Sequence, residues 1–252
     1  MPAMGVNASF YAPLANALVE EGLNVVTADL RGHGESSIRP GRHTNFGYRE
    51  MVLYDWPSIV GQVKALFPHS QKIILGHSLG GQLTPLYLSD NLGEIDRLIM
   101  VAAPSLYWLD WPFPRSVILL LLTSIFSVLA KVLGYFPGRK IGIGSAEAMR
   151  LMSDWARIAR RGRYDMIRPD EDYVSSLREL RIPLLAISFC DDGFAPKLAV
   201  DRYCQRMPGV SLTRWHIAPE DLDRETLGHL WWVNGSETLA KRIARWLSDT
   251  TD

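Results

Sequence analysis

A serine lies between two glycines where the chain passes from an apolar run into a helical pattern. The pentapeptide Gly76-His77-Ser78-Leu79-Gly80 follows the extended run Lys72-Ile73-Ile74-Leu75. A Gly-x-Ser-x-Gly turn between a strand and a helix is typical of a nucleophile elbow, whose tightness excludes larger flanking side chains and lifts the serine hydroxyl towards a base. The pattern predicts Ser78 as a nucleophile. It also predicts that the N–H of Leu79, at the start of the helix, donates to a developing oxyanion.

A serine hydroxyl needs a base at neutral pH, and the base needs an orienting carboxylate. Where this elbow occurs, the acid and then the histidine follow the serine along the chain. Asp191 and Asp192 both follow an apolar run that ends at Phe189, so two acids compete. His229 follows a glycine in the loop after the last predicted strand, whereas His216 lies inside that strand. We therefore predict His229 as the base.

Composition restricts the classes of function. The chain has 252 residues, a formal net charge of zero and only two cysteines. We expect no nucleic-acid partner, since no excess of positive charge is present. No metal-ligand spacing and no phosphate-binding glycine loop occurs, so we predict neither a metal nor a cofactor. No basic-then-apolar leader is visible, and the two cysteines cannot build a disulfide framework, so we expect a cytoplasmic, reducing location.

Strand-like and helix-like segments alternate along most of the chain. This alternation predicts an α/β fold with a mostly parallel sheet wrapped by helices. The alternation stops between Pro104 and Leu180. The sequence of this segment indicates helices, and such an insertion predicts a cap or lid. We expect residues 1–103 and 181–252 to form the core and residues 104–180 the cap. The predicted strands are 24–30, 72–75, 95–102, 181–189 and 210–217, and the predicted helices are 10–21, 48–67, 80–89 and 237–248.

Residues 117–133 form the most apolar stretch of the chain. They fall short of the roughly 20 apolar residues that a membrane-spanning helix needs. The first interpretation is a cap helix packed on the core. The alternatives are a helix that lines an apolar acyl pocket and one that makes peripheral contact with lipid.

Four segments together resemble the α/β-hydrolases, in the branch of serine esterases, lipases and lysophospholipases. They are Asp29–Ser36, Gly76–Gly80, Asp192–Pro196 and Gly228-His229. The resemblance covers nearly the whole chain and implies that Asp192, rather than Asp191, orients His229, because Asp192 and Pro196 match the family's Asp-x-x-x-Pro turn. More weakly, Phe136–Lys140 and Trp155 of the cap resemble a poorly characterised bacterial branch, which names no substrate.

The resemblance also bears on the start of the chain. In the family, a loop after an early strand supplies the second oxyanion donor. Here that loop is Pro2–Asn7, and Gly5 matches the family's glycine, which makes Val6 the predicted donor and Met4 the alternative. Three strands precede this loop in the family, the third lying between the strands that match 24–30 and 72–75. We therefore expect the natural chain to be longer at its N-terminus.

Taken together, these residues predict a serine hydrolase that cleaves a small carboxylic ester or thioester with an apolar acyl group, through an acyl-enzyme. Two alternatives are kept: a peptidase or amide hydrolase of the same fold, and a non-catalytic binding protein on that fold. We also expect Asp29 and Arg31 to form an ion pair that fixes their loop, the alternative being contact with substrate. The basic run Arg157–Arg163 is interpreted as a solvated helix face, with an anionic substrate as its alternative.

Overall fold

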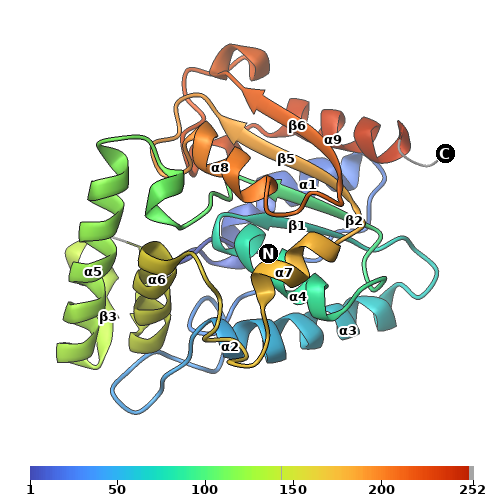
Figure 1. Ribbon diagram of the computed structural model, residues 1–252. Helices are drawn as coiled ribbons and strands as arrows, with labels where there is room; N and C mark the ends of the chain where they lie inside the picture. The colour runs from blue at the N-terminus through green and yellow to red at the C-terminus, as the bar shows by residue number, and fades with distance from the viewer. Residues whose placement is uncertain (143, 250–252) are drawn as a thin grey trace.

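A parallel four-stranded sheet forms the centre of the molecule (Figure 1). The structure is a computed structural model and describes residues 1–142 and 144–249. The strands are β1 (Ile73–His77), β2 (Arg97–Val101), β5 (Pro183–Phe189) and β6 (Ser211–Ile217), in the order β1-β2-β5-β6 with every pair parallel. Because β2 and β5 are the inner strands, nearly all of their residues are buried, as continuous apolar runs require. The predicted parallel α/β fold is confirmed.

Helices cover both faces of the sheet (Figure 1). Two helices from opposite ends of the chain, α1 (Ala12–Glu20) and α9 (Glu237–Asp249), pack together behind the sheet in this view. In front of it lie α4 (Leu79–Asp90), which follows the elbow, and α8 (Lys197–Cys204). The predicted helix 48–67 is continuous but divides into α2 (Tyr48–Glu50), a π-turn η2 (Met51–Asp55) and α3 (Trp56–Leu66).

The segment 24–30 is not a strand, so that prediction is wrong. A strand needs a neighbour for its backbone hydrogen bonds, and a cavity of about 580 Å³ separates this segment from β1. The first residue of the chain closes one end of the gap: the Met1 ammonium donates to the Leu75 carbonyl at 2.7 Å, and the His77 N–H donates to the Met1 carbonyl at 3.0 Å. Burial lowers the pKa of this ammonium to about 5. Apolar side chains line the cavity, among them Leu18, Val25, Val60 and Ile73.

The segment 104–180 leaves the sheet after β2 and returns at β5. It contains α5 (Arg115–Leu133), α6 (Met149–Arg161) and α7 (Tyr173–Ser176). It also contains an antiparallel pair, β3 (Tyr135–Pro137) and β4 (Ala146–Ala148), which the sequence did not predict. Strands of three residues are too short for an alternating pattern to be visible. Short helical turns complete the fold: η1 (Ala8–Tyr11), η3 (Trp108–Asp110), η4 (Gly138–Ile141), η5 (Leu177–Glu179), η6 (Pro219–Leu222) and η7 (Trp231–Val233).

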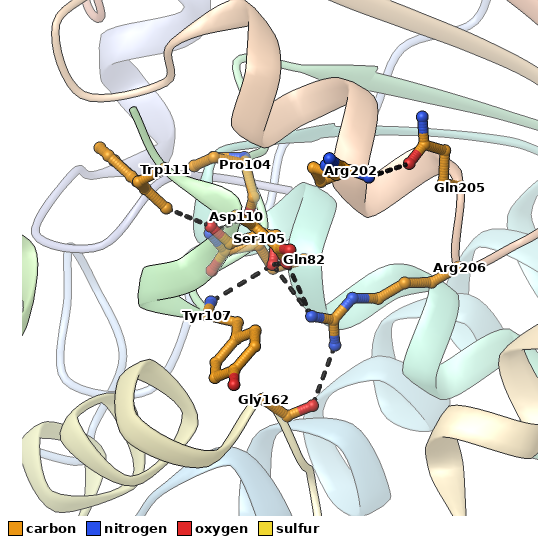
Figure 2. Close-up of polar contacts among 10 residues, drawn as sticks. All are labelled: Gln82, Pro104, Ser105, Tyr107, Asp110, Trp111, Gly162, Arg202, Gln205 and Arg206. Atoms are coloured by element: carbon orange, nitrogen blue, oxygen red, sulfur yellow. Dashed lines mark hydrogen bonds and ion pairs between the residues drawn. The ribbon is translucent and has the colours of Figure 1, made fainter. Parts of the chain in front are cut away.

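One half-buried arginine ties the start of this segment to the core (Figure 2). The Arg206 guanidinium, just after α8, lies between the Asp110 carboxylate at 2.8 Å and the Gly162 carbonyl at 2.9 Å. The Ser105 hydroxyl donates to the same carboxylate at 2.5 Å. Residues 105–110, the end of α6 and the end of α8 therefore meet at one charge-assisted hydrogen-bond network.

Helix α5 meets the length and composition of a membrane-crossing helix. An 18-residue stretch of this helix has a mean hydropathy of 2.3, and 28% of that stretch is buried. No other helix within residues 1–142 and 144–249 meets both criteria. The helix lies at the outer edge of the molecule, on the left of Figure 1, and most of its aliphatic side chains face away from the core.

Candidate active site

Ser78 has the strained backbone that an elbow requires. Its φ of 51° and ψ of −113° lie where residues with a Cβ are rarely found. The flanking glycines are sterically necessary. A Cβ on Gly76 would lie 2.6 Å from the backbone nitrogen of Gly81, and a Cβ on Gly80 would lie 2.4 Å from the Met1 carbonyl oxygen. The turn places the hydroxyl at the carboxyl end of β1.

The structure brings the three predicted catalytic side chains into one hydrogen-bonded chain. Ser78 Oγ lies 3.0 Å from His229 Nε2, and His229 Nδ1 lies 2.8 Å from Asp192 Oδ2. Asp192 is only 3% exposed, and its Oδ1 accepts the backbone N–H groups of Phe194 at 2.8 Å and Ala195 at 3.0 Å. The carboxylate is therefore fixed from behind while its other oxygen faces the imidazole.

Asp191 contacts the loop that carries His229 rather than His229 itself. Its carboxylate accepts the Thr226 hydroxyl at 2.7 Å and the N–H groups of Leu227 at 2.8 Å and Gly228 at 3.0 Å. Partial burial raises the pKa of Asp191, but these hydrogen bonds outweigh it, so the net pKa is lowered and the carboxylate stays charged at neutral pH. Asp191, which competed with Asp192 in the sequence analysis, thus bonds the loop that precedes His229.

His77 lies directly behind the predicted base. The side chain is fully buried, and its ring centroid is 5.0 Å from that of His229. Tyr11 Oη accepts the Ala3 N–H at 2.9 Å and is hydrogen-bonded to His77 Nδ1 at 2.7 Å. Burial, followed by the charge of His229, lowers the pKa of His77 well below its ordinary value, so this imidazole is neutral at pH 7.

Tyr11 was missed by the sequence reasoning, which treated residues 10–21 as an ordinary amphipathic helix. No residue spacing connects a tyrosine to a histidine 66 positions later. The only available signal was that His77 is enclosed by the elbow, so that a buried imidazole must find a partner.

The predicted oxyanion donors differ in their availability. Leu79 is the first residue of α4, so its N–H has no partner within the helix. The N–H of Val6 donates to the Ala3 carbonyl at 3.2 Å and closes a turn. Met4 N–H makes no hydrogen bond within the described part of the chain. The geometry therefore favours the alternative, Met4, over Val6 as the second donor.

The expected ion pair between Asp29 and Arg31 is not formed. Arg31 Nε donates to Asp55 at 2.7 Å, whereas Asp29 accepts the backbone N–H groups of Ala8 at 2.7 Å and Glu35 at 2.9 Å. The two side chains still fix the loop, but by separate contacts. Sequence proximity suggested the pair because the geometry of the intervening turn is invisible in the sequence.

Apolar side chains gather where the segment 104–180 meets the N-terminal loop. Ala130, Phe136 and Met152 form a buried cluster, against which other side chains pack: Met4, Phe126, Leu129, Met149 and Trp155. The Ser145 hydroxyl donates to the Gly5 carbonyl at 3.0 Å, which joins the two segments. In the described ranges, no group of three or more His, Cys, Asp or Glu side chains could hold a metal ion.

A strained serine at a strand–helix turn, hydrogen-bonded through a histidine to a buried aspartate beside a parallel sheet, defines the α/β-hydrolase class. Residues 2–187 match the family described as "Serine aminopeptidase, S33", which is most of the chain. The chain therefore belongs to this family of serine hydrolases. Asp192 and His229 lie beyond the matched residues, so their placement rests on the hydrogen bonds described above.

Solved structures of low sequence identity share the fold. A monoacylglycerol lipase from Paleococcus ferrophilus has a TM-score of 0.65 at 15% identity, over 98% of this chain and 91% of the lipase. A thermophilic esterase from Thermogutta terrifontis, solved with malate bound, has a TM-score of 0.66 at 17% identity, over 98% of this chain and 87% of the esterase.

A curated relative is similar over a shorter range. The "Probable serine hydrolase" of Drosophila melanogaster is 30% identical over 78 residues, which are 31% of this chain. The match spans about a fifth of that relative's length, 22%.

Proposed function

We propose that this protein hydrolyses small carboxylic esters or thioesters with an apolar acyl group, through an acyl-enzyme on Ser78. The observation that carries the proposal is the continuous chain from Ser78 Oγ through His229 to Asp192, with distances of 3.0 Å and 2.8 Å. A binding protein that had lost catalysis would have no need to keep this alignment or the strained serine. The geometry therefore disfavours the non-catalytic alternative.

In the proposed mechanism, Ser78 Oγ attacks the carbonyl carbon while His229 Nε2 takes the hydroxyl proton. The Asp192 carboxylate accepts the Nδ1–H and stabilises the imidazolium that forms. The oxyanion of the tetrahedral intermediate accepts the N–H of Leu79 and a second N–H, for which Met4 is the favoured donor. His229 then gives its proton to the leaving group, and water repeats the sequence to release the acid.

The preference for an apolar acyl group is argued from the cluster beside Met4. Met4 belongs to the loop proposed to complete the oxyanion hole, and Phe126, Met149 and Trp155 pack against the same cluster from the segment 104–180. Phe194, which is 73% exposed, lies 5.6 Å from the His229 ring and adds a further apolar surface on the solvent side. An acyl chain entering here would replace water against these side chains.

A fluorophosphonate probe tests the nucleophile. We expect modification of Ser78, no modification in Ser78→Ala, and loss of ester hydrolysis on the order of 10⁶-fold in that variant. Asp192→Asn should retain the Ser78–His229 contact but lower kcat by roughly 10⁴-fold, because the wrong imidazole tautomer is favoured. A folded protein whose Ser78 resists the probe would contradict the proposal.

The matching family is described as a serine aminopeptidase, so the peptidase alternative is tested beside ester hydrolysis. We expect p-nitrophenyl esters of increasing acyl length to be cleaved, with kcat/KM rising from acetate to medium chains. Proline p-nitroanilide should be cleaved far more slowly. Amide cleavage without ester cleavage would replace the proposed reaction by that of an aminopeptidase while leaving the roles of the triad unchanged.

A further inference from the structure

Helix α5 has its polar and apolar faces reversed relative to a normal surface helix. Its hydroxyl residues Ser116, Thr123 and Ser127 are buried against the protein, together with Leu119 and Ala130. The opposite face is solvent-exposed and aliphatic, with exposures from 39% to 74%. It consists of Val117, Ile118, Leu121, Leu122, Ile125, Val128 and Val132, which recur at the spacing of a single helical face. These seven residues are called the α5 outer face.

The inner side of α5 is firmly attached, so the outer face has a fixed position. Phe126 packs against Phe136 with ring centroids 4.7 Å apart and stacks on Trp155 at 6.5 Å. Ser127 Oγ lies 3.4 Å from Ser153 Oγ of α6. The α5 outer face is therefore held in a fixed position on the protein. A contiguous exposed apolar patch of this kind is typical of an interaction site.

The segment that carries the outer face bears charges of one sign. From Trp111 to Ala146 the chain carries four basic residues, Arg115, Lys131, Arg139 and Lys140, and no Asp or Glu, although the whole chain has a net charge of zero. All four are exposed, and within residues 1–142 and 144–249 none of them pairs with a carboxylate. Two further exposed cations flank the helix: Arg42 donates to the Leu133 carbonyl and Arg160 to the Ser124 hydroxyl.

We propose that the α5 outer face docks onto the surface of an anionic lipid bilayer. The helix lies parallel to the membrane, with Leu121, Ile125 and Val128 in the upper acyl region and the surrounding Arg and Lys side chains at the phosphate groups. The six basic residues named above fit an anionic bilayer. Long basic side chains keep their aliphatic stems on apolar surface while their charges reach anionic headgroups. The inference is independent of the proposed ester hydrolysis.

A second copy of the chain fits this face less well. A symmetric dimer places the same patch against itself, so Arg115 and Lys131 of each copy would meet cations with no acid on the facing segment to pair them. A membrane-spanning arrangement fits less well too, since α5 packs against α6 with Ser116, Thr123 and Ser127 buried against the protein.

Flotation with lipid vesicles tests the proposal. We expect the full chain to float with vesicles of 70% phosphatidylcholine and 30% phosphatidylglycerol, and at least about tenfold less with phosphatidylcholine alone or in high salt. The double variant Leu121→Glu/Ile125→Glu should lose flotation, and Lys131→Glu/Lys140→Glu should lose the preference for the anionic vesicles. The matched control is Leu66→Glu/Leu92→Glu, since these leucines are 66% and 61% exposed elsewhere on the molecule; it should float as the wild type does.

Two measurements distinguish membrane docking from a loss of catalysis and from association between copies of the chain. Hydrolysis of a water-soluble short-chain ester should be equal in the wild type and in all three double variants, so a failure of docking is not confused with a failure of catalysis. Size-exclusion chromatography with light scattering reports association between copies. No flotation by the wild type, equal loss in the control variant, or a dimer that Leu121→Glu/Ile125→Glu dissociates would each overturn the proposal.

Discussion

Two adjacent carboxylates at the end of β5 contact different parts of the site. Asp192 turns inwards to His229, whereas Asp191 turns outwards and accepts three hydrogen bonds from residues 226–228. The loop before His229 is exposed in several places and lies outside helices and strands, so its position depends on such contacts. We therefore expect Asp191 to position the base.

We predict that Asp191→Asn lowers kcat of ester hydrolysis by roughly 10–100-fold with little change in KM. The amide keeps one acceptor oxygen but turns an N–H₂ group towards backbone donors, which displaces the loop by a fraction of an ångström to an ångström. Steady-state kinetics and the melting temperature should be measured together. Asp170→Asn, at an exposed position, is the control. An unchanged kcat would contradict the assigned role.

The hydrogen-bonded arrangement of Ser78, His229 and an acid after β5 could be predicted because its signals are local: a glycine-flanked serine, an acid after an apolar strand, and a histidine in a late loop. The choice of Asp192 over Asp191 came from the family resemblance. Tyr11 and the choice between Met4 and Val6 could not be predicted. Each depends on where one backbone group or hydroxyl points after the N-terminal loop has folded against the elbow. The spacing of residues in the sequence does not indicate that direction. The failed Asp29–Arg31 pair has the same cause.

At the scale of elements, periodicity predicted the long helices and the buried strands well. It failed where an element depends on a neighbour. The apolar run 24–30 has the composition of a strand yet has no strand beside it, and β3 and β4 exist only because they pair with each other. The sequence of α5 showed an apolar helix, but only the packing showed that its aliphatic face is turned away from the core.

The junction between 105–110, α6 and α8 depends on Arg206. Burial lowers the pKa of Arg206, but the facing groups Tyr164 and Asp110 outweigh it, so the net pKa is raised; the Arg206 and Asp110 side chains are 16% and 17% exposed. Arg206→Met should lower the free energy of unfolding by about 3 kcal/mol, because Asp110 is left without its cation. It should also speed hydrogen exchange in residues 104–111.

Arg202→Met, on α8 four residues before Arg206, is the matched control. That guanidinium is exposed, and among the residues that the structure describes it bonds only Gln205, at 3.2 Å, so the change should stay within about 0.5 kcal/mol. Equal effects of the two substitutions in urea unfolding would show that the Asp110 contact is not what stabilises the junction.

At the scale of the whole molecule, one buried acid links stability to pH. Burial raises the pKa of Asp154 to about 6, although its Oδ2 accepts the Tyr48 N–H at 3.1 Å. Because the folded pKa lies above the unfolded one, the folded state binds the extra proton. The contribution of Asp154 is therefore fully present below about pH 4 and is lost as the pH rises through 6.

Asp154→Asn keeps the acceptor for Tyr48 and removes the charge. We expect its free energy of unfolding at pH 7.5 to exceed that of the wild type by about 1–3 kcal/mol, with the difference shrinking towards pH 4. Urea unfolding at a series of pH values measures this. A variant less stable than the wild type at pH 7.5 would show that the carboxylate is stabilised there as an anion.

The gap beside β1 has a consequence for the behaviour of the protein at high concentration. β1 is an edge strand of the four-stranded sheet; Met1 pairs with its carboxyl end, and an apolar cavity, lined on its other side by residues 24–28, runs along the rest. An edge strand bordered by apolar surface is a template on which another extended chain can align its backbone. Self-assembly of this molecule into aggregates should therefore begin at β1, and an antibody fragment or a charged substitution that shields this edge should delay it.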